Sequence, residues 1–261
     1  MSGFDPRGSC ALITGASAGI GREFALQLAG RAGALVLVAR RLDRLEELRN
    51  ELTTKDPNLN VHCRAVDLSQ PAEVDELIAW MDREGIAVDF LINNAGLGDR
   101  GTFVTAEPER LRQMLAVNIV ALTTLTRALL PAMIAKRRGA ILNVSSSAGF
   151  LPIRKMAVYA ASKAYVTSFS DAVRGEVRKE GIVVTALCPG PVDTEFSSVA
   201  RRSMTEQPYP SPSLIHVPVE TVVRDGLNGI ERNKALVIPG IAMKVAMLLV
   251  RLTPRALLRR M

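Results

Sequence analysis

The chain has 261 residues, 48% of them hydrophobic, which is enough to bury a substantial core in one large domain or two small ones. Its formal net charge of +7 suits nucleic acid, an acidic surface or an anionic cofactor as a partner. Aromatic residues make up only 4% and do not alternate with basic ones, which argues against a platform for single-stranded nucleic acid.

The cysteines and the N-terminal residues indicate the compartment, and the histidines bear on metal binding. Cys10, Cys63 and Cys188 are odd in number, far apart and set in apolar runs, which predicts buried, reduced thiols in the cytoplasm. The first nine residues are polar and lack the apolar region of a secretory signal. His62 and His216 stand apart and no metal-ligand spacing occurs, so we expect no metal. The low aromatic content leads us to expect no nucleic acid as a partner.

Short apolar runs alternate with helical periodicity, which predicts successive β-α-β units and a parallel sheet covered on both faces. Strands are expected at residues 11–13, 35–38, 61–66, 90–92, 140–144, 183–187 and 236–238. Helices are expected at residues 19–32, 41–54, 71–84, 108–136, 158–180 and 219–231. No break in composition interrupts this order, so residues 1–240 are predicted to form one α/β domain, a doubly wound Rossmann fold with a seven-stranded, mainly parallel sheet.

A long irregular run follows the sixth expected strand. Residues 189–218 contain Pro208, Pro210 and Pro212 and show no helical or strand period. A loop of this length in a compact domain is usually functional or disordered, and we favour a substrate lid.

A glycine-rich segment lies directly after the first expected strand and opens the first helix. Glycines there let the backbone turn tightly and approach a pyrophosphate, and the helix N-terminus offers free N–H groups. Glycines also make ordinary turns, but the strand before and the helix after favour a dinucleotide. The predicted cofactor contacts in this segment are Gly15, Ser17, Ala18, Gly19, Ile20 and Gly21.

The end of the second expected strand indicates which dinucleotide binds. Arg40 stands where a carboxylate would accept from the ribose hydroxyls of NAD, and a guanidinium there can bind a 2′-phosphate. We therefore predict NADP(H), with Ser17 as a second phosphate donor. Arg40 could instead simply start a solvated helix, and Arg41 is expected mainly at the surface.

Two later strand ends are candidate cofactor contacts as well. Asp67, followed by Leu68, is placed to accept from the adenine amino group, although capping the next helix explains Asp67 equally well. Asn94, Ala95 and Gly96 would permit close approach to a cofactor ribose, and the same residues also form ordinary turns.

The segment from Ser145 to Lys163 carries groups that can handle a proton. Ser145, Ser146 and Ser147 end an apolar run, Tyr159 follows Ser146 by thirteen residues, and Lys163 lies one helical turn later. These groups could act on an alcohol or carbonyl oxygen, but they cannot supply a hydride.

A set of spaced motifs resembles the short-chain dehydrogenase/reductase family over residues 10–240. The motifs are residues 14–21, residues 93–96, Asn118, Ser146, Tyr159, Lys163 and the pair Pro189-Gly190. The resemblance implies that Tyr159 is the general acid and base, with a pKa lowered by Lys163, which also holds the nicotinamide ribose. It implies that Ser146 polarises the substrate carbonyl.

The resemblance implies further roles. Asn118 would hold a water in the proton relay and break its long helix locally, although a purely structural hydrogen bond remains an alternative. The predicted contacts to the nicotinamide carboxamide are Pro189, Gly190, Val192 and Thr194. Ala18 departs from many NADP-using relatives, which carry a basic residue there, so cofactor choice depends mainly on Arg40.

The C-terminal extension, residues 241–261, is amphipathic and basic. One face carries Ala242, Val245, Leu248, Leu249 and Leu252, and a second short helix is expected after Thr253. The apolar run is too short to span a bilayer, so it is expected to pack on a second subunit or to lie at an anionic membrane surface.

The expected protein is a homo-oligomeric (dimer or tetramer), cytoplasmic NADP(H)-dependent oxidoreductase. Its expected substrate is a small-molecule carbonyl or alcohol of apolar character. Residues expected to line the substrate pocket are Gly98, Phe150, Leu151, Phe196 and Met204. Two alternatives stay open: a nucleotide-binding sensor without chemistry, and a membrane-surface interaction protein in which the extension is primary.

Overall fold

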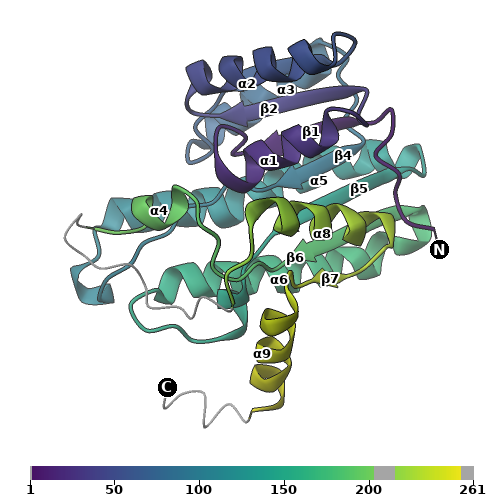
Figure 1. Ribbon diagram of the computed structural model, residues 1–261. Coiled ribbons are helices and arrows are strands. Elements are labelled where there is room, and N and C mark those ends of the chain that lie inside the picture. Colours follow the sequence, from purple (N-terminus) through teal and green to yellow (C-terminus); the bar gives the residue numbers. More distant parts are fainter. Residues whose placement is uncertain (1, 203–214, 254–261) are drawn as a thin grey trace.

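The computed structural model describes residues 2–202 and 215–253 (Figure 1). Within them, seven strands form a single sheet in the order β3-β2-β1-β4-β5-β6-β7, and all pairings are parallel. The strands are β1 (Cys10–Thr14), β2 (Ala34–Ala39), β3 (Asn60–Ala65), β4 (Phe90–Asn93), β5 (Gly139–Val144), β6 (Ile182–Leu187) and β7 (Leu236–Val237). The order reverses between β1 and β4, which opens a crevice at their carboxyl ends and confirms the predicted doubly wound fold.

Helices cover both faces of this sheet (Figure 1). They are α1 (Gly19–Leu28), α2 (Leu42–Lys55), α3 (Pro71–Arg83), α4 (Pro108–Leu115), α5 (Leu122–Ala135), α6 (Ala157–Val177), α7 (Phe196–Val199), α8 (Val219–Glu231) and α9 (Ile241–Leu252). Side chains of α1, α2 and α8 share one buried cluster with Ala11 and Ile13 of β1, whereas those of α3, α5 and α6 share the other with Leu12. Alternate side chains of a strand thus point to opposite faces of the sheet, and both faces are buried. This explains why the strands appear in the sequence as continuous apolar runs.

The expected helix at 108–136 is divided in the structure. A π-helical turn, η2 (Ala116–Ala121), separates α4 from α5, and Asn118 lies in that turn. The continuous run Pro108–Ala135 is long and apolar enough to cross a membrane by length and composition alone. Leu125 and Met133 of this run are buried in the same cluster as side chains of α3 and of the sheet, so in this structure they belong to the core.

The segment after β6 is less irregular than predicted. It contains the short helix α7. Elsewhere in the described chain there are three 3-10 helices: η1 (Phe103–Thr105), η3 (Ser147–Phe150) and η4 (Arg178–Glu180), which follows α6 directly. Residues 203–214 lie outside the described residues, and so does the body of the predicted lid. The short helix expected after Thr253 also lies outside them.

Two buried amides connect the centre of the sheet. Asn93 of β4 and Asn143 of β5 are register partners, and the Asn93 Nδ2 donates to the Asn143 Oδ1 at 2.9 Å. Asn93 also donates to the Thr126 hydroxyl at 3.1 Å, and Asn143 donates to the Ser170 hydroxyl at 2.9 Å. Because buried amides need partners, this network ties α5 and α6 to a single strand register.

Candidate functional site

The glycine-rich segment between β1 and α1 packs closely under the end of β4. Gly15 has φ +68° and Gly19 has φ +52°, values that favour glycine. A Cβ added at Gly21 would lie 2.3 Å from the Gly15 carbonyl oxygen, and the Asn94 Nδ2 donates to the Thr14 carbonyl at 2.8 Å. The first turn of α1 contains no acidic residue, so its backbone N–H groups can face an anion.

Three arginines surround the far end of this cradle. Arg41 donates to the Ser17 hydroxyl at 3.2 Å and to a Glu195 carboxylate oxygen at 3.0 Å, and Arg44 donates to the other Glu195 oxygen at 2.8 Å. These two guanidinium groups hold the pKa of Glu195 below its usual value through hydrogen bonds. Arg40 is exposed beside them and, within the described part of the chain, forms no ion pair. Its guanidinium is therefore available to a phosphate.

Asp67 and Leu68 follow β3 at the edge of the same cavity. The Asp67 carboxylate accepts from the backbone N–H of Ser69 at 2.9 Å and from its hydroxyl at 2.8 Å. The residue that precedes α3 is Gln70, which makes no side-chain cap. Asp67 therefore shapes the turn before α3 rather than capping the helix itself.

A single cavity of about 1240 Å³ joins the cradle to the proton-handling groups. This volume exceeds the roughly 300–1,000 Å³ of ordinary ligand pockets, which suits two bound molecules. It is lined by most residues predicted from sequence, namely Gly15, Ser17, Ala18, Ile20, Arg40, Arg41, Asp67, Leu68, Asn94, Ala95, Gly96, Ser146, Tyr159, Lys163, Pro189, Gly190, Val192 and Thr194. Gly19, Gly21 and Asn118 do not line it and lie behind its wall.

Ser146, Tyr159 and Lys163 meet at the centre of this cavity. Ser146 precedes η3, and its Oγ accepts from the Ala148 N–H at 3.1 Å. Tyr159 is buried and shares a side-chain hydrogen bond with Ser146. The Lys163 Nζ donates to the Val144 carbonyl at 2.8 Å and lies 5.9 Å from the centre of the Tyr159 ring.

Burial dominates the acidity of these groups. It raises the pKa of Tyr159 above its ordinary value, while the hydrogen bond with Ser146 opposes this shift. Burial lowers the pKa of Lys163 to about 8. The sequence led us to expect a lowered pKa for Tyr159, and in the structure desolvation of the phenolate acts in the opposite direction. The phenol is therefore protonated at neutral pH.

Asn118 supports the floor of the site from the π-helical turn. Its Oδ1 accepts from the Leu97 N–H at 2.8 Å, and its Nδ2 donates to the Leu97 carbonyl at 2.9 Å and to the Ser162 hydroxyl at 3.0 Å. A Cβ added at Gly96 would lie 3.4 Å from the Lys163 Nζ and 3.5 Å from the Asn118 Oδ1. Asn118 thus makes the purely structural hydrogen bonds of the alternative, and both Asn118 and Lys163 approach Gly96.

The substrate side of the cavity is apolar. Leu151 and Phe196 line it as expected, and the Phe196 ring centre lies 5.4 Å from that of Tyr159. Gly98 lies behind Phe196, Phe150 does not line the cavity, and Met204 lies outside the described residues. Sequence reasoning missed Met243 and Met247 of α9, which are buried on the face opposite the predicted apolar stripe. Their spacing of one helical turn was the available signal.

The sequence of the chain is similar to those of known proteins. A family model described as short chain dehydrogenase matches residues 9–205. The very-long-chain 3-oxoacyl-CoA reductase of Phaeosphaeria nodorum is 34% identical over 206 residues, which are 78% of this chain and 60% of that protein. The dehydrogenase/reductase SDR family member 7B of Bos taurus is 36% identical over 195 residues, covering 73% of this chain and 60% of that one. The chain thus spans about 60% of the length of both relatives.

Solved structures match over more of the chain. The short-chain dehydrogenase from Sphingobium yanoikuyae in complex with NADPH superposes with a TM-score of 0.83 at 31% identity, covering 97% of this chain and 96% of that one. The bulky-bulky ketone specific alcohol dehydrogenase from Comamonas testosteroni gives a TM-score of 0.78 at 29% identity, covering 97% and 94%.

Proposed function

Because this chain belongs to the short-chain dehydrogenase family, we propose that it is an NADPH-dependent reductase of bulky apolar ketones or 3-oxoacyl chains. The observation that carries the proposal is that Ser146, Tyr159 and Lys163 line the same cavity as the glycine cradle and Arg40. The proposed reaction adds a hydride to the carbonyl carbon and a proton to its oxygen, and the reverse reaction oxidises the alcohol.

The cradle fits a dinucleotide phosphate. Side chains at Gly15 and Gly21 would collide with Asn94 or with backbone atoms of the cradle, so glycine is needed for this close packing. The first turn of α1, which has no acidic residue, would offer its free N–H groups to a pyrophosphate. Arg40 and Ser17, which line the same cavity, would hold the 2′-phosphate, while Arg41 is engaged by Glu195. When bound, NADPH supplies the hydride from its nicotinamide. Further contacts proposed from the lining are Asp67, Leu68, Asn94, Ala95, Gly96, Pro189, Gly190, Val192 and Thr194.

Tyr159 is the proposed proton donor. Its raised pKa keeps the phenol protonated near neutrality, as reduction of a carbonyl requires. Ser146 would donate to the same oxygen and polarise it as negative charge develops. The Lys163 ammonium would stabilise the phenolate that forms when Tyr159 gives up its proton. Asn118 would hold a water in the proton relay toward Lys163.

The lining favours a bulky apolar substrate. Phe196, Leu151, Met243 and Met247 surround the space beside Tyr159. The Phaeosphaeria relative acts on 3-oxoacyl-CoA and the Comamonas enzyme on bulky ketones, according to their names. We do not retain the alternative of a binding protein without chemistry, because the three reactive groups meet in one cavity.

NADPH oxidation over a carbonyl panel tests the proposal. Tyr159→Phe is expected to abolish reduction while NADPH binding, followed by its fluorescence, stays within about twofold of wild type. Tyr165→Phe is the matched control, because Tyr165 lies on the same helix and its hydroxyl pairs with Thr123 at 3.0 Å outside the cavity. Unchanged turnover by Tyr159→Phe would refute the role of the phenol.

We further propose that α9 and the basic tail contact an anionic membrane surface. Ile241, Val245, Leu248, Leu249 and Leu252 are each more than half exposed on α9. Residues 232–261 contain seven Lys and Arg and no Asp or Glu, which equals the net charge of +7 of the whole chain. Exposed apolar side chains flanked only by basic ones suit acidic headgroups.

Vesicle sedimentation tests this contact. Binding is expected to vesicles that contain phosphatidylserine and to weaken in Leu248→Asp/Leu249→Asp, whereas Val104→Asp, at another exposed apolar position outside α9, is expected to bind as wild type. Equal binding to neutral vesicles, or dimerisation that buries α9, would contradict it. The second outcome would support the expected homo-oligomer instead.

A further inference from the structure

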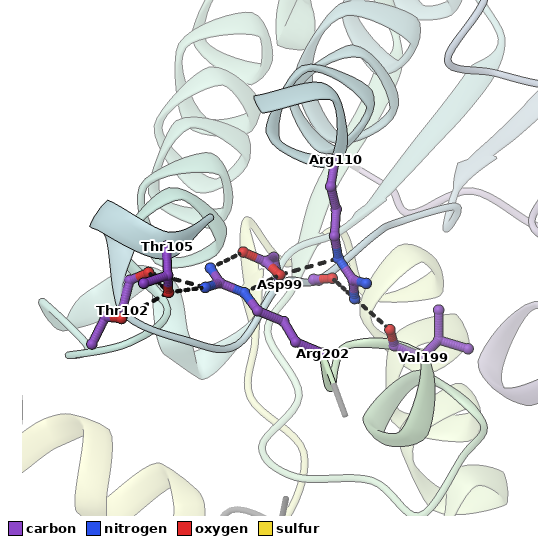
Figure 2. Close-up of polar contacts among 7 residues, drawn as sticks. Asp99, Thr102, Thr105, Arg110, Val199 and Arg202 are labelled. Carbon is purple, nitrogen blue, oxygen red and sulfur yellow. Dashed lines mark hydrogen bonds and ion pairs between the residues drawn. The ribbon is translucent and has the colours of Figure 1, made fainter. Parts of the chain in front are cut away.

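A buried carboxylate lies behind the substrate side of the cavity, apart from the proposed reactive groups. The Asp99 side chain is 3% exposed. Its Oδ1 accepts from the Arg202 Nε at 2.9 Å and its Oδ2 from the Arg202 Nη2 at 2.5 Å (Figure 2). The Arg110 Nε lies 3.1 Å from the Asp99 Oδ1. One carboxylate therefore joins two guanidinium groups that come from distant parts of the chain.

The same two arginines also bind the backbone of the cavity wall. Arg110 donates to the Val199 carbonyl at 2.6 Å, and Arg202 donates to the Thr102 carbonyl at 3.0 Å and to the Thr105 hydroxyl at 2.9 Å (Figure 2). Thr102 and Val199 both line the cavity. The cluster of Asp99, Arg110 and Arg202, hereafter the clamp, thus joins three segments: the loop after β4, helix α4, and the segment that follows α7.

Backbone contacts reinforce this connection. The Arg100 N–H donates to the Ala200 carbonyl at 2.9 Å, and Arg100 and Arg201 form an isolated parallel bridge. A Cβ at Gly98 would lie 2.8 Å from the Phe196 ring and 2.9 Å from the Ala200 Cβ. The segment that carries Phe196 is therefore seated directly on the residues next to Asp99.

A buried charge cluster contributes little net stability, because desolvation offsets the attraction between its charges. What it specifies is geometry, since a bidentate arginine pair tolerates few arrangements. Here the geometry that the clamp defines is the position of Phe196, whose ring lies against Tyr159 at an interplanar angle of 44°.

We propose that the clamp positions segment 196–202 so that Phe196 forms the wall that determines which substrates fit beside Tyr159. Asp99, Arg110 and Arg202 are positioning residues, and Phe196 is the specificity-determining residue. The proposal rests on the proposed reductase function. A bulky substrate contacts the wall and a small one does not, so loosening the clamp changes the selectivity of the enzyme more than its chemistry.

The experiment compares Asp99→Asn with Asp89→Asn. Asp89 is a matched control: its side chain is 15% exposed, and Lys136 and Arg138 lie 3.4 and 3.9 Å from it at the opposite end of β4. Steady-state kinetics use the smallest and the bulkiest carbonyl that wild type reduces. The rate of amide hydrogen exchange in the peptide covering residues 196–202 measures how firmly the clamp holds this segment, and it does not depend on turnover.

Asp99→Asn is expected to lower kcat/KM for the bulky substrate at least about tenfold, mainly through KM, while the small substrate changes less than about threefold. Exchange over residues 196–202 is expected to rise in Asp99→Asn and not in Asp89→Asn. Phe196→Ala, which leaves the clamp intact, should reproduce the loss for the bulky substrate without the faster exchange.

Equal losses for both substrates, or unchanged exchange, would overturn the proposal. If Asp99→Asn does not fold, Arg202→Lys keeps the charge and loses the bidentate contact, and the same pattern is expected in milder form. A wild type that reduces no carbonyl would refute the reductase function, and hydrogen exchange would still decide whether the clamp holds the segment.

Discussion

Replacing Asn118 by alanine separates its structural and catalytic roles. The side chain is 1% exposed and satisfies both the N–H and the carbonyl of Leu97. The substitution strands these two backbone groups, each at a cost of about 1–3 kcal/mol for a fully buried group. Because Leu97 is only partly buried, we expect the free energy of unfolding to fall by about 2–4 kcal/mol. That is a large share of the roughly 5–15 kcal/mol of a typical domain.

Urea unfolding followed by circular dichroism measures this loss. Ser162→Ala is the comparison, because it leaves both bonds of Asn118 to Leu97 and removes the bond to Asn118 and the bond from the Ser162 hydroxyl to the Tyr159 carbonyl at 2.7 Å; a loss of about 1–2 kcal/mol is expected. If Asn118 also serves the proton relay, turnover per folded Asn118→Ala molecule should fall at least about tenfold. A stability loss below about 1 kcal/mol would refute the structural reasoning, and unchanged turnover per folded molecule would refute the relay.

Three further outcomes are expected. Arg40→Asp should reverse the preference for NADPH over NADH, measured as the ratio of their kcat/KM values. Arg41→Ala should change this ratio less, because Glu195 holds the Arg41 guanidinium. An Arg40→Asp variant that still favours NADPH would show that Arg40 is not the residue that binds the 2′-phosphate. Gly21→Ala should abolish NADPH binding in a fluorescence titration, because its Cβ would meet a backbone oxygen, and Gly30→Ala, with nothing within 4 Å, should bind normally. The rate of reduction should fall as pH rises through about 8, where Lys163 loses its proton, and a pH–rate profile flat to pH 10 would contradict this.

Most of the sheet was predictable because each strand is buried on both faces. Leu12 and Ile13 contact opposite layers of helices, so the sequence shows an apolar run rather than alternation. The cavity lining near β1, β2 and β4 was predictable for a related reason. Parallel strands end at one edge, so residues that follow separate strands, such as Gly15, Arg40 and Asn94, are brought together.

Other features depend on contacts between distant residues and leave no local pattern. The break of the long helix at Asn118 was expected only from the family resemblance, and its form, a π-helical turn held by hydrogen bonds to Leu97, is seen only in the structure. Asp99 and Arg202 are 103 residues apart, and no spacing rule connects them. The direction of the Tyr159 pKa shift was wrong in the prediction, because desolvation depends on packing that the sequence does not show.

The amides of Asn93 and Asn143 have a consequence for the alignment of the two halves of the cavity. Asn94 directly follows Asn93, and Ser145 and Ser146 come two and three residues after Asn143, so each amide lies just below one side of the cavity. A slip of one residue between β4 and β5 would turn an amide away from its partner and leave it buried without a hydrogen bond. Neither amide titrates, so the register that aligns the end of β4 with the end of β5 is held at any pH where the fold persists.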